Sequence, residues 1–110
     1  MEQVDFKKML KDMLGVAKTE FSDYWKEVKP YAEKELKSFL DNVKLIAKLK
    51  LKNTINEEQA KLHMNLQINS MRMVFLTIEG LGLLAVQSAI NSMIDIARNT
   101  VNTAIGWTIL

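Results

Sequence analysis

The stretch FLTIEGLGLL, residues 75–84, decides how many helices this chain of 110 residues forms. It contains one charge, Glu79, and two glycines, Gly80 and Gly82. A glycine at position 80, followed by the hydrophobic Leu81, is a suitable end for a helix. However, no Ser, Thr, Asp or Asn follows that would cap a new helix. The stretch therefore predicts that one helix continues through both glycines.

The polar residues on both sides of this stretch support a continuous helix. They recur at steps of three or four residues, and Leu76 and Leu83 fill two vacant positions of the series. This spacing is typical of one helix face. The pattern predicts a single helix over residues 55–106, mostly apolar, with one narrow polar stripe: Asn65, Asn69, Arg72, Glu79, Gln87, Asn91, Asp95, Arg98 and Asn102.

The first half of the chain has the complementary pattern, an apolar stripe on a polar helix. The mean step of 3.6 residues is the helical period, and its phase does not change across Pro30. A proline inside a helix removes the hydrogen bond to the carbonyl four residues earlier and kinks the helix. We therefore expect one helix over residues 3–52, kinked at Pro30, with this apolar stripe: Leu10, Leu14, Ala17, Phe21, Trp25, Val28, Ala32, Leu36, Phe39, Val43 and Ile46.

A turn at residues 53–54 separates the two predicted helices. Thr54 and Glu57 have the spacing of a capping box, which marks the start of a helix. The lysines of residues 44–52 suit the preceding helix end, where the macrodipole favours positive charge. The sequence thus predicts an all-α protein, an antiparallel hairpin of two long helices, each about 72 Å long.

The position of the turn also fixes which residues of the hairpin face each other. Glu35 is expected opposite Arg72, and the ring of Trp25 opposite Gly82. Glu79 falls near Val28, where a lysine stem can lie along apolar surface and bring its ammonium group to the carboxylate. The predicted ion pairs involve these residues: Glu35 with Arg72, and Glu79 with Lys26 or Lys29.

The second helix is apolar on most of its circumference, and one partner helix cannot cover it. We therefore expect two hairpins to pair into a dimeric four-helix bundle. The expected oligomer interface is Leu83, Leu84, Val86, Ile90, Ile94 and Trp107. A buried polar layer of Glu20, Gln87 and Asn91 would fix the register of the bundle. The alternative is a monomeric up-and-down four-helix bundle with breaks near Pro30, Asn53 and Gly80.

A carboxylate-bridged metal site of the ferritin-like kind is the second function class that the sequence leaves open. Such bundles need Glu-x-x-His pairs, whereas the chain has a single histidine, His63, with alanine three residues before it. The remaining metal-ligand candidates are Glu20, Glu79 and His63.

Composition and charge narrow the remaining function classes. The absence of cysteine fits a reducing, cytoplasmic location and removes thiolate chemistry. Two arginines and lysines interspersed with acids indicate no nucleic-acid surface. Residues 73–91 are a borderline membrane segment, but three polar residues interrupt them, so membrane association is the less favoured alternative. We expect a self-associating structural or interaction protein that has no identifiable catalytic activity and needs no cofactor.

Overall fold

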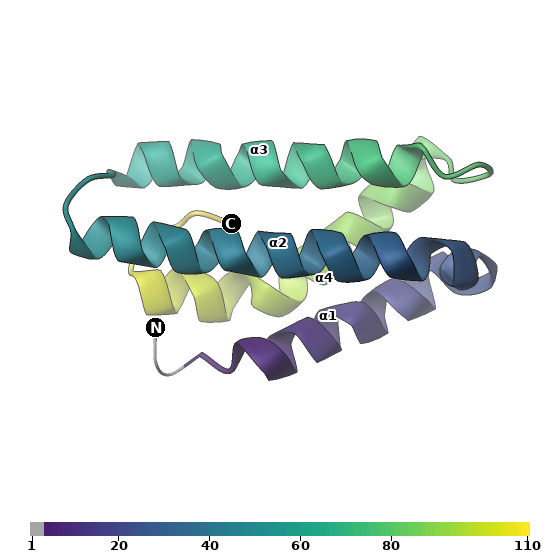
Figure 1. Ribbon diagram of the computed structural model, residues 1–110, viewed down its shortest axis with the longest axis horizontal. Helices are drawn as coiled ribbons and strands as arrows, with labels where there is room; N and C mark the ends of the chain where they lie inside the picture. The colour runs from purple at the N-terminus through teal and green to yellow at the C-terminus, as the bar shows by residue number, and fades with distance from the viewer. Residues whose placement is uncertain (1–3) are drawn as a thin grey trace.

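The computed structural model describes residues 4–110, which form an all-α structure without strands (Figure 1). A single turn of 3₁₀ helix, η1, connects the first two helices. The elements are α1 (Phe6–Phe21), η1 (Ser22–Tyr24), α2 (Trp25–Leu51), α3 (Glu57–Leu76) and α4 (Leu83–Ile105). They pack compactly within 43 × 24 × 19 Å. Because the predicted hairpin would measure about 72 Å, the chain is folded over on itself.

The predicted continuous helix over residues 3–52 is wrong at Ser22, and its predicted start at residue 3 lies outside the described residues. The backbone of Ser22 has φ 50°, a left-handed value that ends α1 and turns the chain. Pro30 lies inside α2 and does not end it. Since Pro30 and Lys26 are both exposed, water can solvate the carbonyl that the proline leaves without a hydrogen bond.

The predicted helix over residues 55–106 is also wrong, because α3 ends inside FLTIEGLGLL. Thr77 closes the helix by donating its hydroxyl to the Val74 carbonyl, 2.6 Å away. Gly80 then takes φ 92°, and a Cβ atom there would lie 2.8 Å from Cε1 of Tyr24. Gly80 is therefore needed both for its backbone conformation and for the close approach of the tyrosine ring.

The alternative with four shorter helices had placed its breaks near Pro30, Asn53 and Gly80. Two of these positions agree with the described residues, while the first break lies at Ser22–Tyr24 instead of Pro30. The possible membrane segment, residues 73–91, is divided between α3, the following link and α4. Within residues 4–110 no helix is long and apolar enough to cross a bilayer.

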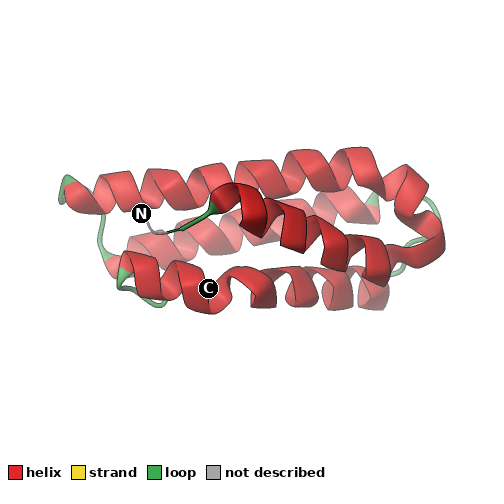
Figure 2. Ribbon diagram, turned by 90° about the horizontal axis from the view of Figure 1, so that it is seen from below, coloured by secondary structure: helices red, strands yellow, loops and turns green. Residues whose placement is uncertain are grey.

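Both bends lie at the same end of the molecule, so the structure is a long hairpin folded in half (Figure 1). α1 packs against α2 and α4, and α3 packs against the same two helices. Figure 2 shows the links between helices gathered at the two ends. At the folded end the rings of Phe21 and Phe75 pack in a tilted arrangement, with centroids 5.2 Å apart. One hydrophobic core runs through the molecule, with buried residues from all the helices.

The predicted register of the hairpin is kept between α2 and α3. Asn42 of α2 donates to the side chain of Gln67 and lies 3.2 Å from Nε2 of His63. These contacts are centred on the turn at residues 53–54, as the sequence predicts. The cap of α3 differs from the prediction, because the capping box is formed by Asn56 and Gln59 and not by Thr54 and Glu57.

The burial of Phe75 gives a first test of this core. Its side chain is fully buried beside Phe21, and truncating a buried phenylalanine to alanine costs about 3–5 kcal/mol. We expect Phe75→Ala to lower the free energy of unfolding by that amount in urea titrations. Leu51→Ala, at an exposed position at the end of α2, is the control and should change it by less than about 1 kcal/mol. Equal losses in the two variants would contradict this core.

Candidate interaction surface

Helix α3 has two apolar faces on opposite sides. The inner face is buried in the core and consists of Ala60, Met64, Met71 and Phe75. The opposite side carries large apolar side chains at helical spacing, which we call the outer face of α3: Leu62, Leu66, Met73 and Leu76. Their exposed fractions are 60%, 62%, 69% and 38%. A surface helix ordinarily has a polar outer side, so this row is unusual for a helix that faces only water.

The apolar row of the outer face contains one polar residue, Asn69, and no charged residue. Asn69 lies between Leu66 and Met73 and accepts a hydrogen bond from Arg72, 2.7 Å long. The guanidinium group of Arg72 is half-buried at the flank, and its Nε atom is buried without a hydrogen-bond partner. Isolated exposed leucines are common on proteins, whereas several large apolar side chains gathered on one face are typical of a contact surface.

Most of the predicted oligomer interface on α4 is covered by the chain itself. Val86, Ile90 and Ile94 are buried in the core, because folding the hairpin in half brings α1 and α3 onto α4. Leu83 and Leu84, in the first turn of α4, are exposed. They are therefore the predicted interface residues on this helix that remain free to meet a partner.

Trp107, the remaining predicted interface residue, is half-buried against the end of α2. The ammonium group of Lys50 lies 4.7 Å from its ring centroid, a cation–π contact. Asn102 holds the following segment on α4 by accepting from the backbone N–H groups of Ile109 and Leu110. The apolar residues after α4 thus dock within the chain.

The predicted buried polar layer is replaced by a different set of contacts. Glu20 accepts a hydrogen bond from Ser92, 2.6 Å long, and a longer one from Ser88 at 3.5 Å. Gln87 and Asn91 were expected to face Glu20. Gln87 is half-buried and Asn91 is exposed, and neither forms a hydrogen bond with Glu20. In the structure the serines at positions 88 and 92 of α4 therefore lie opposite Glu20, each one residue beyond a predicted partner.

The three metal-ligand candidates lie on separate elements. Glu20 lies on the last turn of α1. His63 lies on α3 and is hydrogen-bonded to Asn42 of α2. Glu79 is exposed in the link between α3 and α4. Among residues 4–110 no group of three or more histidine, aspartate or glutamate side chains could hold a metal ion. The structure thus brings none of the three candidates together.

The predicted ion pairs are also absent from the described part of the chain. Its salt bridges join Lys8 to Asp12, Asp41 to Lys44 and Asp95 to Arg98, all within single helices. Glu79, Lys26 and Lys29 are exposed to solvent, and Glu35 is buried on α2. Glu79 was expected on a helix facing Val28, but the bend places it in the link instead.

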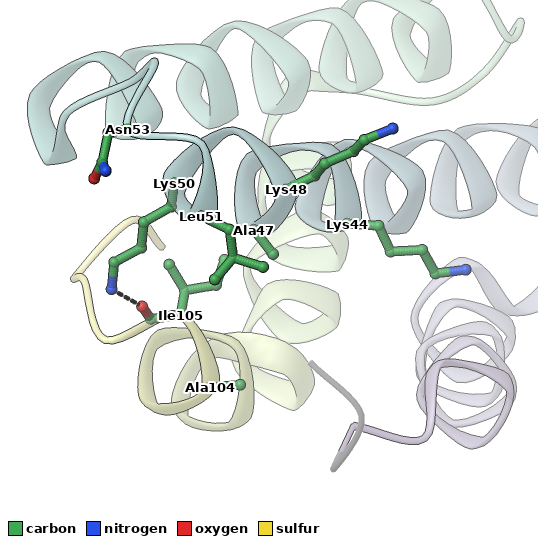
Figure 3. A pocket seen from close by; sticks show the side chains of 8 residues that line it. All are labelled: Lys44, Ala47, Lys48, Lys50, Leu51, Asn53, Ala104 and Ile105. Carbon is green, nitrogen blue, oxygen red and sulfur yellow. Dashed lines mark hydrogen bonds between the residues drawn. The ribbon is translucent and has the colours of Figure 1, made fainter.

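A cavity of about 600 Å³ lies between the ends of α2 and α4 (Figure 3). Three lysines line it, but their ammonium groups point in different directions (Figure 3). Lys50 donates to the Ile105 carbonyl, and Lys44 lies 4.8 Å from the Phe6 ring centroid. Because these charges do not converge, the cavity offers no anion site. The lining residues are Lys44, Ala47, Lys48, Lys50, Leu51, Asn53, Ala104 and Ile105.

Lys50 has a structural role at this end of the molecule. The last carbonyl groups of a helix lack partners within the helix and carry partial negative charge. The Lys50 ammonium group binds one of them, on Ile105, and also contacts Trp107. These two contacts of Lys50 hold the end of α4 against the end of α2.

Comparisons of the chain with protein-family models, curated proteins and solved structures find no match. The functional assignment therefore rests on the surface of the molecule itself.

The contact between Lys50 and the end of α4 gives a second test. Lys50→Met keeps most of the apolar stem but removes the charge, so we expect the free energy of unfolding to fall by about 1–2 kcal/mol. Lys48→Met, at an exposed position in the same turn, is the control and should change it by less than about 0.5 kcal/mol. Thermal unfolding followed by circular dichroism measures both, and equal effects would rule out this role of Lys50.

Proposed function

We propose that this protein is a self-associating helical structural or interaction module, and that two copies meet through the outer face of α3. The observation that supports the proposal is the row of exposed apolar side chains opposite the core face of that helix. A helix that is apolar on two opposite sides needs two partners. The chain provides the inner one, and a second copy provides the outer one.

The outer face suits a second copy because it is symmetric about its own middle. Leu62 and Leu76 lie near its ends, Leu66 and Met73 lie on either side of the centre, and Asn69 is close to the midpoint. Two copies related by a two-fold axis near Asn69 pack antiparallel, with apolar residues opposite apolar residues along the row. Such isologous contacts are the commonest interfaces of homodimers.

The strength of the association follows from how much of this row is exposed. The exposed parts amount to roughly two whole side chains per copy, and burying one leucine or methionine contributes about 1.5–3 kcal/mol. Two copies therefore gain about 6–12 kcal/mol, against an association cost of about 4–15 kcal/mol. We expect a dimer that dissociates on dilution, with the exposed Leu83 and Leu84 as further apolar contact area.

Polar substitutions on the outer face test the proposal. The double variant Leu66→Gln, Met73→Gln should shift the midpoint of dimer dissociation to at least tenfold higher concentration, because each copy loses apolar area at the centre of the contact. Sedimentation equilibrium from about 1 μM to 1 mM spans the affinities that this area allows.

The control for this experiment is Leu51→Gln. Leu51 is the most exposed of the large apolar residues, at 85%, and it lies at the end of α2, away from the outer face of α3. Its substitution should leave the midpoint unchanged. A native chain that remains monomeric at 1 mM, or an equal shift in both variants, would refute the proposed contact.

A further inference from the structure

The bend at Ser22–Tyr24 does not interrupt the apolar phase of the first half of the chain. Phe21, the last buried residue of α1, and Val28, the first of α2, are seven residues apart, which is two helical turns. Trp25, half-buried, occupies the position between them. Two helices joined by an ordinary link need no common phase, whereas the buried residues of α1 and α2 would form one straight stripe on a continuous helix.

The second bend has the same property. Phe75 is buried before it, Ile78 is buried within it, and Val86 and Ile90 are buried after it, at spacings that fit one helix face with Gly82 at the vacant position. Both halves of the chain are therefore patterned as straight helices, although the structure folds each of them once.

The contacts across the hairpin are compatible with the straight form. Asn42 bonds to Gln67 between α2 and α3, and Glu20 accepts from Ser88 between α1 and α4. Both pairs are centred on the same point of the sequence, beside Thr54. A straight antiparallel hairpin that turns at that point keeps both pairs. Folding it in half adds only the contacts of α1 with α2 and of α3 with α4.

The two bends also lack the side-chain caps that mark the other helix starts. α1 begins with a cap from Asp5, and α3 begins with the capping box of Asn56. By contrast, α2 and α4 begin at residues without a side-chain cap, and Ser22 holds a positive φ without being glycine. Among the described residues, the α-helices that start at the two bends are therefore the ones without a side-chain cap.

We propose that a second copy of this chain takes the place of each molecule's own folded half, through reciprocal exchange at the two bends. Both bends straighten, and two long hairpins pair so that α1 of one copy packs on α2 of the other, and α3 on α4. The same core faces are buried as in the folded monomer, now between copies. Exchange of identical elements is a low-cost route to dimers because few new contacts are needed.

This exchanged dimer is distinct from the contact through the outer face of α3. It uses the core faces of the helices, and it leaves Leu66 and Met73 exposed in both forms. The two proposals can therefore succeed or fail independently.

Matched glycine substitutions shift the equilibrium. Gly80→Ala introduces backbone strain at φ 92° in the folded monomer and requires the Tyr24 ring to move aside, while alanine suits the straight helix. Gly82→Ala gains the same helix preference, but Gly82 has ordinary backbone angles and open space at its Cβ. We expect Gly80→Ala to dimerise at a concentration at least tenfold lower than Gly82→Ala, as measured by light scattering.

Introduced cysteine pairs identify which dimer has formed, because the native chain has no cysteine. The pair Phe6→Cys, Lys44→Cys joins α1 to α2, whose contact should pass between copies on exchange. The pair Asn42→Cys, Gln67→Cys joins α2 to α3 and should stay within one copy. Treatment of the dimer fraction with a short bismaleimide should give covalent dimers from the first pair and covalent monomers from the second.

Covalent monomers from both pairs in the dimer fraction would overturn the exchange, and they are the result expected if only the outer face of α3 associates. If Gly80→Ala does not fold, the same two pairs in the otherwise native chain at 1 mM decide the question. Failure of the first pair to give covalent dimers there would also overturn the exchange.

Discussion

The packing of Tyr24 against Gly80 joins the two bends of the chain at one end of the molecule. The tyrosine comes from the first bend, and the glycine offers the space for its ring in the second. At the same end of the molecule the tilted rings of Phe21 and Phe75 pack across the core. Because both bends lie at the same end of the molecule, α1 packs against α2 and against α4 at the same time. A single bend would leave half of each apolar stripe in water.

The sequence predicts the all-helical class, the turn after α2 and the register across that turn, but not the division into four helices. Asn42, Gln67 and His63 meet because a hairpin turn at residues 53–54 leaves little freedom in the register. The bends could not be predicted from the period, because the apolar phase is the same on both sides of each. Gly80 was a visible signal, but its role depends on a ring that comes from another part of the sequence.

The candidate surface was predictable only in its general nature. The excess apolar character of the second half indicates a partner, and α3 indeed carries more apolar surface than the core uses. In the folded monomer Val86, Ile90 and Ile94 of the predicted interface on α4 are buried by the chain itself, because the structure is not a straight hairpin. Once the hairpin folds, two neighbours cover α4, and the surplus lies on the outer side of α3.

An apolar stripe specifies that a face is buried, but it does not specify which copy of the chain buries it. In this protein the apolar stripes of α1 and α2 have the same helical phase. A helix of the same chain can therefore cover them, and so can a helix of a second copy in the proposed exchange. The choice then depends on the links, where Ser22 and Gly80 hold backbone conformations that only the folded monomer needs. The choice also depends on the protein concentration, because the proposed exchanged dimer carries the free-energy cost of association and the monomer does not. The core thus sets the stability of the fold, whereas the backbone conformations at the two bends decide between the folded monomer and the proposed exchanged dimer.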